Sequence, residues 1–124
     1  MKPNLLMMCL ACVSDMVRLG DLSITNVTCK PDEYRGARKF ELKRPISYLE
    51  RSSFIYDFEK GCSVVAAWKA SAIYLCHERP EKISITSQEV GRLAHEGNSA
   101  CWSGTFVALV MTAQNITVRL QKPT

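Results

Sequence analysis

Residues 62–76 have the sequence CSVVAAWKASAIYLC, and this stretch decides the fold class of the chain. Two apolar runs, Cys62–Trp68 and Ala72–Cys76, flank a short linker that contains Lys69. Branched and aromatic residues are frequent in both runs, and this composition favours strands. The stretch therefore predicts an antiparallel β-hairpin. A helix over Val64–Leu75 remains the alternative, because the linker lacks the glycine or asparagine that favours a hairpin turn.

The register of this hairpin predicts a disulfide. With the loop centred on Lys69, Cys62 lies opposite Cys76 and Val65 lies opposite Ile73. Facing residues at a non-hydrogen-bonded position of an antiparallel pair come close enough for their sulfur atoms to bond. The hairpin is therefore expected to be closed covalently at its open end.

The remaining cysteines extend this prediction. The chain has six cysteines, two of which lie in the first twenty residues. The other four permit three pairings. Once Cys62 is joined to Cys76, elimination leaves Cys29 and Cys101 as the second disulfide. Small domains that are stabilised by disulfides are typical of secreted proteins.

The segment 1–20, MKPNLLMMCLACVSDMVRLG, supports two interpretations. A positive charge followed by the apolar run Leu5–Val13 has the outline of a secretory signal peptide, which is removed from the mature protein. In the other interpretation, Asn4 caps an N-terminal helix that ends at Gly20 and stays in the fold. The run is too short for a membrane span, which needs about 20 apolar residues. Residues 21–124 are expected to form a single compact domain.

Two Asn-x-Thr sequons, at Asn26 and Asn115, fit the secretory interpretation. Such sequons accept N-linked glycans in the secretory pathway, where disulfides also persist. With an intact N-terminal helix, the chain would instead be an intracellular protein, for example a viral one, with reduced cysteines.

Outside the hairpin, the sequence predicts a strand-rich domain. Residue alternation and turn signals predict further strands: Leu22–Cys29, Arg38–Lys43, Ser53–Phe58, Lys82–Thr86, Thr105–Thr112 and Asn115–Leu120. Pro45 is expected to stop the second of these strands or to mark a sheet edge. The spacing of Thr86 and Glu89 is that of a capping box, which predicts a helix near 87–96 that ends at Gly97. The fold class is therefore α+β, a small antiparallel sheet or sandwich with one short capped helix.

Five cations lie between residues 35 and 44, and they form the first candidate binding site: Arg35, Arg38, Lys39, Lys43 and Arg44. Such a patch is suited to the phosphates of RNA or the sulfates of a glycosaminoglycan, although a solvated loop and edge strand carry similar charges. Trp102 is the second candidate, because it follows a cysteine, precedes Ser-Gly and belongs to the residue type most enriched in interface hot spots. The net charge of +4 is modest and acidic residues interrupt the cations, so a protein partner is favoured over a polyanion.

The pair of His-Glu dipeptides at His77 and His95 is the one arrangement that suggests catalysis. Two imidazoles and two carboxylates could perform acid–base chemistry, as in a small hydrolase such as a ribonuclease. No third residue completes such a site, and no cofactor motif or metal-ligand spacing is present. The sequence therefore favours a non-enzymatic role.

Together these features predict a small secreted, disulfide-stabilised binding glycoprotein that acts on a host or partner macromolecule. An effector, a toxin-like protein or an immune-evasion factor involved in virulence would have this character. The alternative is an intracellular accessory or regulatory protein that keeps its N-terminal helix and its free thiols.

Overall fold

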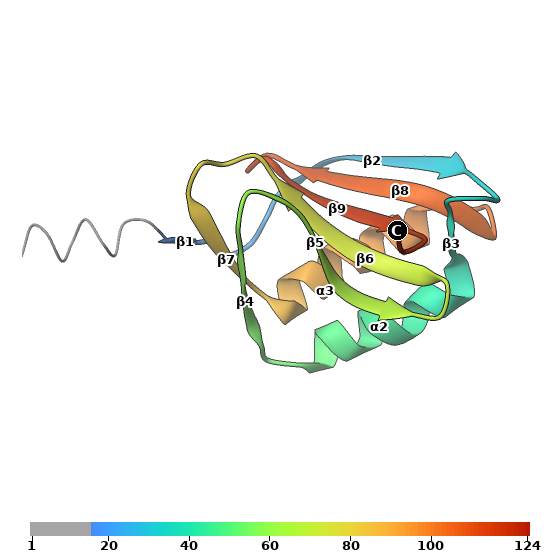
Figure 1. Ribbon diagram of the computed structural model, residues 1–124, viewed down its shortest axis with the longest axis horizontal. Coiled ribbons are helices and arrows are strands. Elements are labelled where there is room, and N and C mark those ends of the chain that lie inside the picture. The colour runs from blue at the N-terminus through green and yellow to red at the C-terminus, as the bar shows by residue number, and fades with distance from the viewer. Residues whose placement is uncertain (1–15) are drawn as a thin grey trace, which may run out of the picture.

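A computed structural model describes residues 16–124, and its main sheet is covered by helices on one face (Figure 1). Five antiparallel strands follow the order β2-β8-β9-β6-β5, and β3 also pairs with β8. The strands are β2 (Ile24–Pro31), β3 (Ala37–Arg38), β5 (Gly61–Trp68), β6 (Ser71–His77), β8 (Thr105–Thr112) and β9 (Ile116–Gln121). The helices are α2 (Lys39–Arg51) and α3 (Ser87–Ala100). The predicted α+β, strand-rich class is confirmed.

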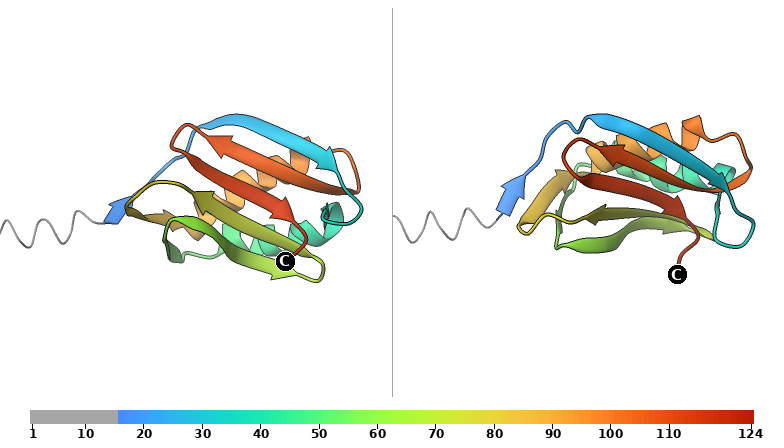
Figure 2. Two further views of the ribbon diagram at one scale, coloured as in Figure 1. Left: turned by 45° about the horizontal axis from the view of Figure 1, so that its top comes forward. Right: turned by 90° about the horizontal axis from the view of Figure 1, so that it is seen from above.

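A smaller sheet lies at one end of the molecule (Figure 2). Its central strand β7 (Lys82–Thr86) pairs in parallel with β1 (Met16–Arg18) and antiparallel with β4 (Ile55–Phe58). Most of the N-terminal segment that the sequence assigns to a leader or a helix, residues 1–15, lies outside the described residues. Because Met16–Arg18 form a strand, a helix that continues to Gly20 is wrong for this part of the segment.

The strand predicted over Arg38–Lys43 is wrong, because these residues open helix α2. Leu42, Ile46 and Leu49 recur at helical spacing, and all three are buried in the core. Pro45 lies inside the helix, where it removes one backbone hydrogen bond. The burial of this apolar stripe against the sheet offsets that loss, so packing outweighs the local signals for a strand end.

The hairpin predicted over residues 62–76 is confirmed as β5 and β6, and its two cysteines face each other. Its register differs from the prediction beyond the first half of β5. Ile73 faces Ala66 and not Val65, because a β-bulge at Val65 adds one residue to β5. The turn accordingly shortens to Lys69-Ala70, and Lys69 takes a left-handed backbone conformation with φ 54°.

Helix α3 begins as the sequence predicts and ends later. The Thr86 hydroxyl accepts a hydrogen bond of 3.2 Å from the Glu89 amide, which is the expected N-terminal cap. The helix continues to Ala100, and Gly97 lies within it. A Cβ atom on Gly97 would come within 2.7 Å of the Val110 side chain. Glycine here permits close packing of α3 on the sheet and does not end the helix.

The Glu89 carboxylate has a different role from the one that a capping box predicts, which is to accept from the Thr86 amide. It accepts hydrogen bonds from the backbone amide of Leu22 and from the Arg92 guanidinium. Burial alone would raise the pKa of Glu89, but these hydrogen bonds hold its pKa below the ordinary value. The ionised carboxylate therefore fastens the segment before β2 to the first turn of α3.

Both expected disulfides are present in the structure. Cys29–Cys101 joins β2 to the end of α3 across a sequence separation of 72 residues. Cys62–Cys76 joins facing positions of β5 and β6, with a Cα–Cα distance of 4.0 Å and a separation of 14 residues. One disulfide therefore connects the helical layer to the sheet, and the other reinforces a hairpin.

We expect the two disulfides to contribute unequally to stability. In the chain-entropy model, the stabilisation by a disulfide grows with the length of the loop that it closes. Removing the Cys62–Cys76 disulfide by Cys62→Ala/Cys76→Ala should lower the free energy of unfolding by about 3 kcal/mol. Removing the Cys29–Cys101 disulfide by Cys29→Ala/Cys101→Ala should lower it by about 4 kcal/mol. Urea unfolding of both double variants measures the difference. A larger loss for the hairpin pair, or peptide mapping that joins Cys62 to Cys29, would contradict the assignment.

The N-terminal cap of α3 gives a second prediction. Thr86→Ala removes the hydroxyl acceptor from the Glu89 amide and should lower the free energy of unfolding by about 1 kcal/mol. Thr86→Ser keeps that acceptor and serves as the matched control, with most of the stability retained. Equal losses in the two variants would show that the methyl group, and not the cap, matters.

Candidate functional site

Two loops that are far apart in the sequence lie side by side at the end of the molecule opposite the small sheet (Figure 1). The Asp32 amide donates to the Thr105 carbonyl oxygen at 3.3 Å, and the Lys39 amide donates to the Gly104 carbonyl oxygen at 2.9 Å. These bonds join the loop before α2 to the loop between α3 and β8. We refer to residues 32–40 and 101–105 together as the loop-end surface.

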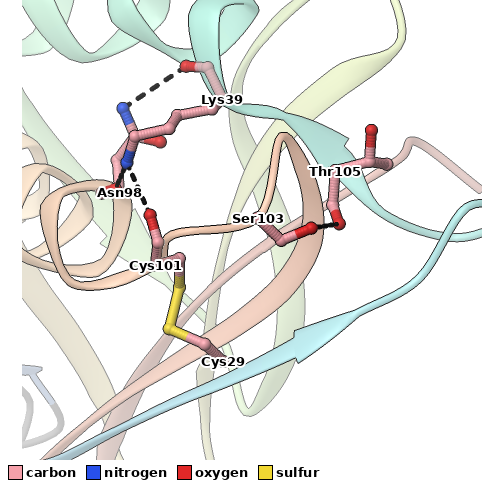
Figure 3. Close-up of a disulfide and its surroundings, with 6 residues drawn as sticks. All are labelled: Cys29, Lys39, Asn98, Cys101, Ser103 and Thr105. Atoms are coloured by element: carbon pink, nitrogen blue, oxygen red, sulfur yellow. Dashed lines mark hydrogen bonds between the residues drawn. A yellow bond between two sulfur atoms is a disulfide. The ribbon is translucent and has the colours of Figure 1, made fainter.

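Trp102 projects from this surface with 97% of its area exposed. The backbone on both sides of it is held in place. Cys101 is buried and bonded to Cys29, while the Ser103 hydroxyl donates to the Thr105 carbonyl oxygen at 2.9 Å (Figure 3). Trp102, the second candidate from the sequence, is therefore accessible to a partner on a loop that these contacts hold in place.

The neighbouring loop exposes two further aromatic side chains, Tyr34 at 85% and Phe40 at 65%. Its turn is organised by Asp32, whose Oδ1 atom accepts from the amides of Arg35 at 2.8 Å and Tyr34 at 2.9 Å. These two hydrogen bonds lower the pKa of Asp32. A Cβ atom at Gly36 would clash with the Asp32 carbonyl oxygen at 2.2 Å, so glycine is required for this turn.

Lys39, one of the predicted binding cations, has an internal role. Its Nζ atom donates to the carbonyl oxygen of Asn98 and, at 2.8 Å, to that of Cys101 (Figure 3). The ammonium group also lies 5.8 Å from the centroid of the Phe106 ring. Carbonyl groups at a helix C-terminus lack intrahelical donors and carry partial negative charge, so this cation stabilises the end of α3.

The other four cations lie on separate surfaces, two of them before α2 and two on it. Arg35 and Arg38 are exposed on the loop-end surface. Lys43 lines a groove between α2 and α3, and Arg44 stacks 4.1 Å above the centre of the Trp68 ring. The five cations of the predicted patch therefore lie on more than one surface, and their role in binding stays a prediction.

The two histidines occupy separate environments. His77 is the last residue of β6 and is 2% exposed, with its Nε2 atom 3.1 Å from the Phe58 carbonyl oxygen. His95 is exposed on α3 and lines the same groove as Lys43, whereas His77 lines a different cavity. The fold does not bring the two imidazoles into one site, and the hydrolase hypothesis gains no support.

The two sequons lie at the end of β8 remote from the loop-end surface. Asn26 faces Met111 across the β2–β8 pair, and Asn115 lies in the turn that follows β8. Both side chains are exposed. Asn115 has φ 63°, a left-handed conformation that asparagine tolerates. Glycosylation remains a prediction, and glycans at these positions would leave Trp102 uncovered.

Within residues 16–124, no group of three or more His, Cys, Asp or Glu side chains is placed to hold a metal ion. In the same range, no helix is both long enough and apolar enough to cross a membrane. No model of a protein family matches the sequence, and no curated protein is significantly similar to it.

The position of Lys39 predicts that it stabilises the fold. Lys39→Met keeps the apolar stem but removes the ammonium group, so the last carbonyl groups of α3 lose their donor. We expect a loss of about 1–2 kcal/mol in the free energy of unfolding by urea. Lys43→Met is the matched control on the same helix and should change stability by less than about 0.5 kcal/mol. Equal effects of the two substitutions would contradict the internal role of Lys39.

Proposed function

We propose that this chain is a secreted binding protein that recognises a protein partner through the loop-end surface, with Trp102 as its anchor. An effector, a toxin-like protein or an immune-evasion factor would work in this way. The observation that carries the proposal is an indole with 97% of its area exposed, on a loop that a disulfide and several hydrogen bonds hold in place.

The energetics of association favour such a residue. A large aromatic side chain buries about 150–250 Å² in an interface, and a tryptophan hot spot contributes about 2–4 kcal/mol. Because the loop is already ordered, little conformational entropy is lost when the partner binds. Tyr34 and Phe40 extend the apolar area around the anchor, and Arg35 and Arg38 supply a charged rim.

The distribution of charge favours a protein over a polyanion. Affinity for RNA or a glycosaminoglycan comes from several cations that act on one anionic chain. Here Lys39 is engaged by α3, while Lys43 and Arg44 lie on other surfaces. Of the predicted patch, Arg35 and Arg38 remain on the loop-end surface, where Lys122 and Glu33 accompany them. Three cations with a carboxylate among them are a small footprint for a polyanion.

Secretion is supported by the two disulfides and the two exposed sequons. In an intracellular protein the same four cysteines would stay reduced. A count of free thiols under denaturing conditions, on material from the natural source, distinguishes the two locations. Sequencing of its N-terminus tests in addition whether the first residues are removed.

The partner class is tested by comparing Trp102→Ala with the double reversal Arg35→Glu/Arg38→Glu. In quantitative affinity capture from extracellular fluid, Trp102→Ala should reduce recovery of the partner by about 30-fold or more, while leaving the fold intact. The charge reversal should have a smaller effect that depends on salt.

Heparin and RNA serve as polyanion probes in the same experiment. Binding of either one that weakens sharply between low and physiological salt, and that is insensitive to Trp102→Ala, would overturn the proposal. Partner recovery that is equal for wild type and Trp102→Ala would do the same.

A further inference from the structure

A second candidate surface lies along the outer edge of β5, where a groove of about 350 Å³ separates this strand from α2 and β4. Arg44 and Tyr48 of α2, Tyr56 of β4, and Val65 and Trp68 of β5 line the groove. Among these residues, only Arg44 belongs to the basic patch predicted from the sequence.

The backbone of β5 is available for pairing. Within residues 16–124, this strand pairs only with β6, so its other side is an edge of the main sheet. The Cα–Cα distance of 4.0 Å between Cys62 and Cys76 is that of a non-hydrogen-bonded pair. The amide and carbonyl groups of Cys62 therefore point away from β6, and by the same alternation so do those of Val64. Among the described residues, none of the hydrogen bonds outside the sheets and helices engages either group.

The side chains beside this edge combine aromatic surface with positive charge. Arg44 lies 4.1 Å and Lys69 lies 5.8 Å from the centre of the Trp68 ring. Tyr48 and Phe54 are about half exposed, and their ring centroids are 6.3 Å apart.

Within residues 16–124, no carboxylate forms an ion pair with Arg44 or Lys69. Glu41 is buried, and its Oε1 atom accepts hydrogen bonds from the Ser71 hydroxyl and the Ala70 amide. Asp57 follows Tyr56 on β4, so it points to the opposite face of that strand. The groove is therefore cationic as well as aromatic.

We propose that this groove binds an extended peptide segment with acidic side chains, which adds to β5 as a further strand of the main sheet. Backbone hydrogen bonds to Cys62 and Val64 would supply affinity, as in other cases of β-strand addition. Alternate side chains of the peptide would point into the groove, where Arg44 and Lys69 can pair with carboxylates and Trp68 and Tyr48 can cover apolar atoms.

The shape of the edge argues against a second copy of this chain as the occupant. The bulge at Val65 bends the edge, which disfavours a long flat strand and is tolerated by a short flexible peptide.

The test uses a fluorescein-labelled heptapeptide of alternating glutamate and valine, measured by fluorescence anisotropy on the full chain. Arg44→Glu and Val64→Pro should each weaken binding by about ten-fold or more. Proline at position 64 removes an outward amide and leaves the pairing with β6 intact, since edge strands accept proline there. Lys43→Glu and Trp102→Ala are matched controls and should change affinity less than two-fold.

Peptide controls keep the result decisive if Val64→Pro is poorly folded. N-methylation of alternate amides should abolish binding, and replacement of glutamate by lysine should do the same. The proposal is overturned if wild type does not bind the acidic peptide or if N-methylation has no effect. A second copy of the chain would be the occupant instead if the chain self-associates and Val64→Pro abolishes that self-association. RNA would be the occupant instead if a single-stranded RNA oligonucleotide competes the peptide out of the groove. Retention of peptide binding in Trp102→Ala separates this site from the loop-end surface.

Discussion

Cys101 is the residue at which the two layers of the fold are joined. Its sulfur is bonded to Cys29 of β2, and its carbonyl oxygen accepts a hydrogen bond from Lys39 at the start of α2. It also ends α3 and opens the loop that leads to β8. A covalent bond and a charge-assisted hydrogen bond at one residue therefore fix the ends of both helices to the sheet. The positions of Phe40 and Trp102, which follow Lys39 and Cys101 in the sequence, depend on this junction.

This arrangement separates the residues that stabilise the fold from those that are free to bind. Lys39 and Cys101 lie inside the loop-end surface, whereas Phe40 and Trp102, their immediate neighbours in the sequence, face the solvent. Exposed aromatic residues add little to stability, so their presence on a well-held backbone calls for another explanation. Pre-organised recognition provides one, because the ordering of the loops is accomplished during folding and not during association.

The sequence predicts those elements whose signals are local. The β5–β6 hairpin, the cap at Thr86 and the final two strands follow from residue alternation and turn chemistry, and the cysteine pairs follow from the hairpin register. Helix α2 could not be recognised in the same way, because Pro45 signals a strand end and the apolar stripe is stabilised only by contact with a sheet built from distant residues. The site predictions inherited this error in part, since Lys43 and Arg44 are neighbours in the sequence but line different grooves beside α2.

The helical path of α2 also relates the two proposed surfaces to each other. Phe40, Arg44 and Tyr48 are spaced four residues apart and therefore lie on one face of the helix. Phe40 belongs to the loop-end surface, while Arg44 and Tyr48 line the groove along β5. A partner that places a folded part on Trp102 and an extended acidic segment along β5 would contact one continuous stripe. Binding at the first surface would then raise the effective concentration of the segment at the second, so that two weak contacts act as a strong one.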